Sequence, residues 1–338
     1  MLGGRGTVGV VVVLLLLAGC GSSNTKPIPG GVASGAGFSV RLPTGWRSFD
    51  QVTQSQIFRQ SYRQLRAKGV PGHGVLEAGH WINPSSPGEA SLVVDVEPVT
   101  PDTAEATLDQ EQSRLLRQAG ATDVRLLSSP TAVDRVTVTA FAYRLGDFNL
   151  RAFSARRGIY LYSITIGAKD GQMAAVDGLL ATMVKSWHWS TTDVPELSQL
   201  QHYSGRGYRV TLPPGWTGAG SSDAALAGVR GADSLWTGYA DASGRSIAAV
   251  LERPSSNVTL DELVAQELRS GGKREADEQV GGADAAVLDM AARGAHIHEW
   301  VTLHGGREYA IVVRTTDARR ARDDGEVRQA LDSWQFTS

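Results

Sequence analysis

Three histidines in the last third of the chain are the residues best suited to bind a metal ion. His296 and His298 are two positions apart, and His304 follows just before a Gly-Gly turn. Alternate residues of a strand share one face, so these imidazoles should point the same way as Trp300. Two imidazoles at this spacing can share a zinc or nickel ion, but Glu299 alternates away and leaves that face without a carboxylate. On this ligand count the sequence favours a polar sheet face over a metal site.

A basic row at helical spacing is the second candidate site. Arg59, Arg63 and Arg66 lie beside an apolar stripe over residues 58–65, as expected of an amphipathic helix. Such a row on a protein held at a membrane could bind anionic lipid or polymer. Arginine stems also cover apolar surface without any ligand, and surface helices carry such charges routinely. The sequence therefore favours a solvated helix face.

Cys20 is the residue at which a covalent modification is expected. It ends a Leu-Ala-Gly-Cys lipobox at residues 17–20, which follows Arg5 and an apolar run over residues 10–17. That order is typical of an export signal, and the run is too short to cross a bilayer, which takes about 20 residues. We expect residues 1–19 to be cleaved and Cys20 to carry a diacylglycerol, whose two chains anchor stably. Cleavage without lipidation is the alternative. The expected location is the extracytoplasmic face of the cell membrane.

Known catalytic motifs do not occur in the sequence. Residue 302 is a threonine, so His298 does not open the His-Glu-x-x-His motif of metalloproteases. A Gly-x-Ser-x-Gly elbow, a Walker loop and a dinucleotide-binding glycine pattern are missing as well. Ser-x-x-Lys occurs at Ser23 to Lys26, but in a segment with no helix to hold it. We expect a protein that is not an enzyme and needs no cofactor.

Charge and cysteine content bear on the partner and on what stabilises the fold, and length bears on the number of domains. The chain has 35 acidic and 33 basic residues and a formal net charge of −2, whereas a nucleic-acid partner would require a basic excess. Once Cys20 carries lipid, no disulfide can form, so buried apolar area alone must hold the fold. Removing 19 of the 338 residues leaves 319, which suits two domains of ordinary size.

The elements that must position these residues occur twice along the chain. A strand ending in Leu-Pro-x-Gly-Trp spans residues 38–46 and returns at residues 208–216 with the same alternation of apolar and polar residues. Later landmarks recur in the same order: Thr107-Leu108-Asp109 with Thr259-Leu260-Asp261, Tyr160 with Tyr309, and Ser186-Trp187 with Ser333-Trp334. The sequence predicts a flexible tether over residues 20–36, domains over 37–190 and 205–338, and a linker over 191–204.

Each copy reads as strands with helices between them. Hairpins are expected over residues 75–83 with 91–97 and over 234–241 with 246–252, followed by an amphipathic helix, further strands and a last helix that ends in tryptophan. The mostly antiparallel strands predict an α+β domain. The recurring tryptophans should lie in the cores: Trp46, Trp187, Trp216 and Trp334. The others could lie in the core or line a ligand or partner surface: Trp81, Trp189, Trp236 and Trp300.

This pattern resembles the PsbP-like α/β/α sandwich, and the LpqN type of actinobacterial envelope lipoprotein built on that fold. The opening Leu-Pro-x-Gly-Trp strand, the central Thr-Leu helix and the terminal helix with tryptophan carry the resemblance. It implies two tandem PsbP-like domains, where the family pattern has a single one. Members of this fold generally act as non-enzymatic accessory proteins that bind other proteins, so the resemblance implies no catalytic residues.

Three functional hypotheses follow. The favoured one is a membrane-anchored extracytoplasmic lipoprotein that acts as a non-enzymatic protein-binding or accessory factor, with an envelope protein as its partner. The second is a carrier of a small apolar or anionic ligand in a domain pocket or interdomain cleft. The third is a metal-dependent enzyme that uses His296 and His298, which requires the two imidazoles to converge on one ion.

Overall fold

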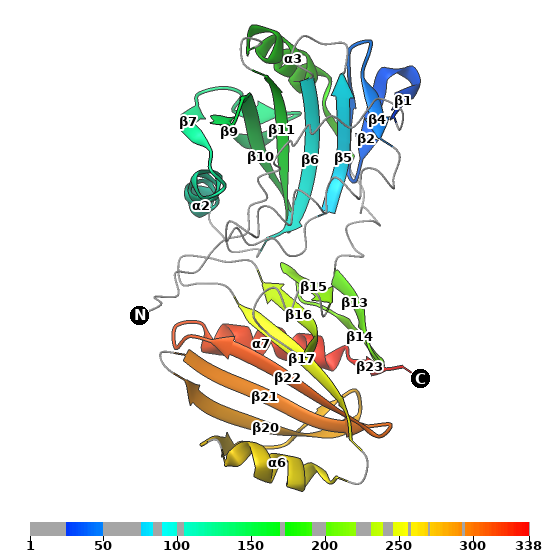
Figure 1. Ribbon diagram of the computed structural model, residues 1–338, viewed down its shortest axis with the longest axis vertical. Helices are drawn as coiled ribbons and strands as arrows, with labels where there is room; N and C mark the ends of the chain where they lie inside the picture. Colours follow the sequence, from blue (N-terminus) through cyan, green and yellow to red (C-terminus); the bar gives the residue numbers. More distant parts are fainter. Residues whose placement is uncertain are drawn as a thin grey trace. The chain divides into compact units, whose positions relative to one another are not determined.

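A computed structural model shows two sheet-rich units (Figure 1). The structure describes residues 25–49, 76–83, 90–99, 105–169, 173–190, 201–220, 231–238, 246–255, 258–269, 271–292 and 295–337. The chain divides into two compact units between Leu197 and Ser198, and each is described here by itself. Within the described ranges no helix is both long and apolar enough to traverse a bilayer.

The first unit is built from twelve strands, the short 3₁₀ helix η2 (Pro29–Gly31) and helices α2 (Glu105–Gln118) and α3 (Met173–Ser186) among its described residues. Its strands are β1 (Thr25–Pro27), β2 (Val32–Gly35), β3 (Phe38–Arg41), β4 (Arg47–Phe49), β5 (Leu76–Asn83), β6 (Ala90–Pro98), β7 (Thr122–Leu127), β8 (Ala132–Val133), β9 (Val136–Leu145), β10 (Phe148–Arg157), β11 (Tyr160–Lys169) and β12 (His188–Trp189). The large sheet has the order β1-β4-β5-β6-β11-β10-β9-β7, with β8 paired to β9, and a small sheet has the order β12-β3-β2.

Neighbouring residues of β10 show that the two helices cover opposite faces of the large sheet. Phe153 meets Trp187, the residue after α3, edge-on with ring centroids 6.3 Å apart. The hydroxyl of Ser154 instead donates to Oε1 of Gln112 in α2 at 2.5 Å. Adjacent residues of a strand point to opposite faces, so the unit has three layers: α2, sheet and α3.

The second unit repeats this plan with helices α6 (Leu260–Leu268) and α7 (Arg320–Asp332). Its strands are β13 (His202–Gly205), β14 (Tyr208–Thr211), β15 (Trp216–Gly220), β16 (Ala232–Gly238), β17 (Ile247–Pro254), β18 (Lys273–Arg274), β19 (Glu278–Val280), β20 (Ala283–Ala292), β21 (Ala295–His304), β22 (Arg307–Thr315) and β23 (Gln335–Phe336). The large sheet has the order β15-β16-β17-β22-β21-β20-β18, with β19 paired to β20, and the small one has the order β13-β14-β23.

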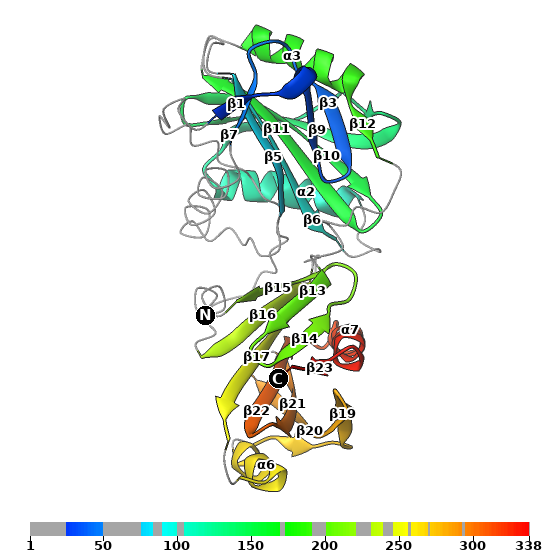
Figure 2. The ribbon, with the colours of Figure 1, turned by 90° about the vertical axis from the view of Figure 1, so that its right-hand side faces the viewer.

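Alternation along β21 again separates two cores, and Figure 2 shows α6 and α7 at different sides of the strands of this unit. Trp300 is fully buried with Val327 and Leu331 of α7, whereas the next residue, Val301, packs with Val264 of α6. All strand pairs within the two large sheets are antiparallel. The α+β class and the α/β/α layering expected from the sequence are therefore confirmed, and both expected hairpins are present as β5–β6 and β16–β17.

The expected tether and linker are shorter than their sequence suggests. Residues 25–35 contain β1 and β2, and β2 pairs with β3, so the first unit begins before residue 37. His202–Gly205 likewise forms β13 against β14. Each unit thus opens with a hairpin whose turn contains a glycine at positive φ, Gly37 at 82° or Gly207 at 78°, a conformation that glycine adopts without steric cost. The polar composition of these segments led us to expect a tether and a linker, although both segments contain short strands.

All eight tryptophans are buried, with relative exposures of 5% or less. The core positions expected for the recurring four are confirmed, and the other four occupy core positions as well. Trp81 of β5 and Trp236 of β16 correspond to each other, because each lies on the strand that pairs with β6 or β17. Trp189 has an aromatic counterpart in Phe336, since these residues pair with Phe38 and Tyr208 in the same way.

The two Thr-Leu-Asp landmarks differ in structure. Thr259 is the N-cap of α6, where its side chain accepts from the backbone of Glu262 and the Glu262 side chain accepts from the Thr259 backbone. This capping box contributes about 1 kcal/mol to helix stability. Thr107 lies inside α2, which begins at Glu105. The second helix therefore starts at the landmark, and the first starts before it.

Candidate functional site

The three histidines share a face of β21, but their surroundings differ. His298 is buried beneath α7 with 3% of its side chain exposed, and His296 is 26% exposed. His304 is exposed and stacks on Phe336 with ring centroids 3.9 Å apart. The expected polar sheet face is present at His296 and His298, but α7 packs over it, so His298 is enclosed. His304 does not join the other two histidines.

His296 and His298 belong to a polar group that we call the Arg320 cluster. It brings together one guanidinium, two imidazoles and four carboxylates: Glu275, Asp289, His296, His298, Asp317, Arg320 and Asp324. Arg320 Nη2 lies 2.7 Å from His298 Nε2, 3.1 Å from Asp289 Oδ2 and 3.5 Å from Glu275 Oε1. The guanidinium thus lies at the centre of the cluster.

The expectation that this face lacks carboxylates is wrong. Glu299 does alternate away, but Asp289 lies directly opposite His298 in the β20–β21 hairpin. Asp324 reaches His298 from α7, with its Oδ1 3.0 Å from Nδ1. Asp317 lies 2.5 Å from His296 Nε2. The acidic groups come from neighbouring elements rather than from β21 itself.

The partners of His298 assign its proton. A guanidinium only donates hydrogen bonds, so Nε2, which faces Arg320, carries the lone pair. The proton then lies on Nδ1, facing the Asp324 carboxylate at a distance of 3.0 Å, although the angle there is not that of a regular hydrogen bond. Nε2 of His298 therefore faces the guanidinium at the centre of the cluster, and Nδ1 faces a carboxylate.

A second buried network fixes the first turn of α7, and with it Arg320. Arg319 Nη2 donates to Ser246 Oγ at 2.7 Å, and Ser246 donates to Asp323 Oδ1 at 2.5 Å. Thr315 donates to the other oxygen of Asp323, also at 2.5 Å. Side chains with this many partners hold one conformation, so the helix presents Arg320 and Asp324 to the sheet in a defined way.

The opposite face of the same sheet carries a buried carboxyl. Glu299 is 6% exposed, and burial, with the negative charges of Glu267 and Glu308 adding to it, raises its pKa from 4.5 to about 7. Arg253 lowers the pKa in part. A carboxyl in this environment titrates near neutral pH.

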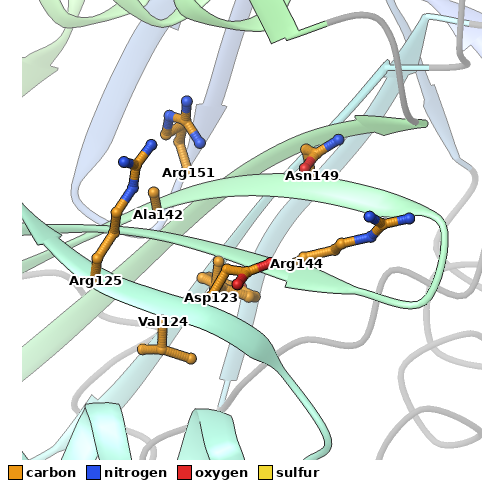
Figure 3. A pocket seen from close by; sticks show the side chains of 8 residues that line it. Asp123, Val124, Arg125, Ala142, Arg144, Asn149 and Arg151 are labelled. Carbon is orange, nitrogen blue, oxygen red and sulfur yellow. The ribbon is translucent and has the colours of Figure 1, made fainter.

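The first unit contains a basic hollow of about 500 Å³ along β7, β9 and β10. Three arginines line it, Arg125, Arg144 and Arg151, together with Asp123 and Asn149. Figure 3 shows Arg125 and Arg151 rising on the same side of the strands, on either side of Ala142. Planar guanidinium groups bind carboxylates and phosphates in a bidentate manner, so this hollow suits an anionic group.

Two of these arginines are held in place by other groups. Arg151 Nε lies 3.0 Å from Asp177 Oδ1 of α3, and Arg144 Nε donates to the carbonyl of Gly146 at 3.1 Å. Tyr143 also lines the hollow, and burial holds its pKa well above the ordinary value, so its phenol stays neutral. No sequence pattern predicted this site, because its residues come from strands that become neighbours only through sheet pairing.

Other candidate residues lie outside the described part of the chain. These are the lipid-attachment residue Cys20 and the basic row, Arg59, Arg63 and Arg66. Their roles stay predictions from the sequence.

Comparisons with known proteins return structures rather than sequence relatives. No family model and no curated protein matches the chain. Among solved structures the chain is similar to cyanobacterial PsbP (CyanoP) from Synechocystis sp. PCC 6803, at 16% identity and a TM-score of 0.30, over 40% of this chain and 92% of that one. A protein from Bacteroides thetaiotaomicron VPI-5482 is similar at 11% identity and a TM-score of 0.26, over 53% of this chain and 51% of that one.

Proposed function

We propose that this chain is a membrane-anchored extracytoplasmic lipoprotein that acts as a non-enzymatic protein-binding or accessory factor of the cell envelope. The lipobox ending at Cys20 supports the location. The observation that carries the accessory role is the duplicated scaffold, in which each unit closes its own core around a matched aromatic stack. A duplicated scaffold that lacks a catalytic motif in its sequence suits binding better than catalysis.

We further infer that the units are tandem copies of one PsbP-like domain, as in a doubled LpqN-type lipoprotein. Both open with a glycine-turn hairpin, continue with a long hairpin and a helix on one face, and end with a helix on the other face. Phe38 and Trp187 in the first unit occupy the places of Tyr208 and Trp334 in the second. Shared order and shared core contacts support duplication.

Cell fractionation with crosslinking tests this function. The wild type should reach the membrane fraction as a processed lipoprotein, whereas Cys20→Ala should leave the chain unprocessed or release it. Crosslinking in cells should then capture the same envelope protein with wild type and much less of it with Cys20→Ala. A Cys20→Ala chain that is processed and membrane-bound like the wild type contradicts the lipid anchor. A wild type that crosslinks to no envelope protein contradicts the accessory role.

A second candidate is a carrier of a small anionic ligand, because three arginines line the basic hollow and the side chains of Arg125 and Arg151 rise on the same side of it (Figure 3). Inorganic phosphate is a suitable probe, with the arginine Nε–H signals followed by NMR. Phosphate should shift the signals of Arg125 and Arg151, and Arg125→Ala should weaken binding. Arg209→Ala is a matched control, since Arg209 is exposed and donates to Gln335 in the other unit. Equal binding by both variants would exclude the hollow as the carrier site.

A further inference from the structure

The geometry points to a binding site for a divalent transition-metal ion in the second unit, formed by Glu275, Asp289 and His298. One ligand atom from each residue lies within 4.8 Å of the other two. The Arg320 guanidinium occupies the centre of this site in the structure. The site does not depend on the proposed accessory role, and it concerns binding rather than catalysis.

The spacing of two ligand atoms suits a tetrahedral ion. His298 Nε2 and Asp289 Oδ1 are 3.3 Å apart. Two ligands at about 2.1 Å from a zinc ion in tetrahedral geometry lie roughly 3.4 Å apart. Glu275 supplies the third ligand, and its side chain is 34% exposed, so it has room to move inward. Water would complete the coordination, as in open zinc sites with three protein ligands.

These two atoms also favour a positively charged group between them, a place that Arg320 takes in the structure. Nε2 of His298 carries a lone pair, because its nearest neighbour is a guanidinium that can only donate. Asp289 Oδ1 is buried and accepts no hydrogen bond. Two acceptors facing each other at 3.3 Å repel unless a positive charge lies between them.

His298 is already oriented as a metal ligand. Its Nδ1 faces the carboxylate of Asp324 at 3.0 Å, and metal-binding histidines characteristically direct their other ring nitrogen to a carboxylate. The tautomer and ring orientation that a metal would need are present.

The charge of the cluster favours a dication over the guanidinium. Three carboxylates lie near Arg320, from Glu275, Asp289 and Asp324, and a fourth, from Asp317, contacts His296. The carboxylates of the cluster outnumber its one guanidinium, and charge near a buried group is costly unless it is paired. A divalent ion would compensate more of it than Arg320 does.

Arg320 is therefore a built-in competitor for the metal. It is the first residue of α7 and its side chain is 32% exposed, so the guanidinium can turn toward solvent. The Arg320 Nε already lies 3.8 Å from Asp324 Oδ2. Asp324 can therefore remain an ion-pair partner of Arg320 after a metal displaces the guanidinium from the centre of the site. Metal affinity should be limited by the energy needed to move this one side chain.

Zinc titration of the purified full-length chain, without an affinity tag and after chelator treatment, tests the site. Calorimetry should show one Zn²⁺ per chain. Arg320→Met keeps the length of the side chain but removes the competing charge, and should raise the affinity at least about tenfold. His298→Asn and Asp289→Asn should each lower it at least about tenfold, in line with the loss of a metal-supporting group. Co²⁺ should give the absorption of a tetrahedral site.

His304→Asn is the matched control, because His304 lies on the same strand but stacks on Phe336. It should bind zinc as the wild type does. Circular dichroism of each variant reports whether it folds. If His298→Asn or Asp289→Asn does not fold, Glu275→Gln, which removes the third ligand, is measured in its place. X-ray absorption of the zinc-loaded wild type should show one imidazole with oxygen ligands. The site is refuted if Arg320→Met binds no zinc, or if His298→Asn and the wild type bind it equally.

Discussion

Tyr208 stacks on Trp334 with ring centroids 4.1 Å apart and ring planes inclined by 10°. Phe38 and Trp187 form the same stack in the first unit, at 4.6 Å and 11°. The aromatic residue that begins β3 or β14 thus meets the tryptophan that follows the last helix of the same unit. The stack joins the beginning of each unit to its end and closes the core.

The double variant Tyr208→Ala, Trp334→Ala should show how much this stack contributes. Stacked aromatic pairs add about 0.5–1.5 kcal/mol beyond the area that they bury. The sum of the two single losses should exceed the loss of the double variant by about that amount, measured by urea unfolding of the second unit. Alanine variants of Phe38 and Trp187, alone and together, provide the same double-mutant cycle in the first unit. Strict additivity in both units would mean that the stack has no energy of its own.

Trp216→Ala should strongly destabilise the second unit. Trp216 is fully buried, and its Nε1 donates to Glu326 of α7 at 2.7 Å. Truncating a buried tryptophan costs about 3–5 kcal/mol, a large part of a domain stability of about 5–15 kcal/mol. Calorimetry should show a lower Tm for the second unit and an unchanged first unit. Unaltered stability with loss of partner capture would instead make Trp216 a recognition residue.

Stability of the second unit should fall as the pH rises from about 4.5 to about 7. Burial raises the pKa of Glu299 from 4.5 to about 7 in the folded state, so the unfolded chain loses this proton first. The contribution is complete below pH 4.5 and is lost as the pH rises to about 7, and it amounts to about 3 kcal/mol. Glu299→Gln should flatten this slope in urea unfolding at pH 5 and pH 8.

Glu267→Gln tests what raises the pKa of Glu299. The charge of Glu267 adds to the raised pKa of Glu299, so its removal should lower that pKa and reduce the slope without abolishing it. A Glu299→Gln variant with the full wild-type slope would show that another group titrates in this range.

A fragment of residues 201–338 should be more stable than one of residues 205–338. The shorter fragment lacks most of β13, which pairs with β14. It also lacks Tyr203, which packs against the main core of the unit. Calorimetry should show a cooperative transition at a higher Tm for the longer fragment. Identical transitions would mean that β13 adds nothing to the unit.

The sequence by itself determined the elements and their order. Strand and helix periods are local, so the Leu-Pro-x-Gly-Trp strand, the hairpin of residues 234–241 with 246–252 and the helix from Leu260 were all predictable. The face of His298 was predictable for the same reason, because alternation in β21 depends on that strand alone. Asp289 could have been found as well, since it lies opposite His298 across a hairpin turn. The tryptophans that recur by repetition were correctly placed in the cores.

Only the tertiary structure decided what those faces meet. Arg320 and Asp324 share one side of α7 by their i, i+4 spacing, but no local pattern says that this side packs on His298. The basic hollow likewise exists because β7 pairs with β9 and β9 with β10. The charge around a buried imidazole depends on packing between elements far apart in the chain. That packing turned an expected polar surface into an enclosed cluster of acids around one arginine.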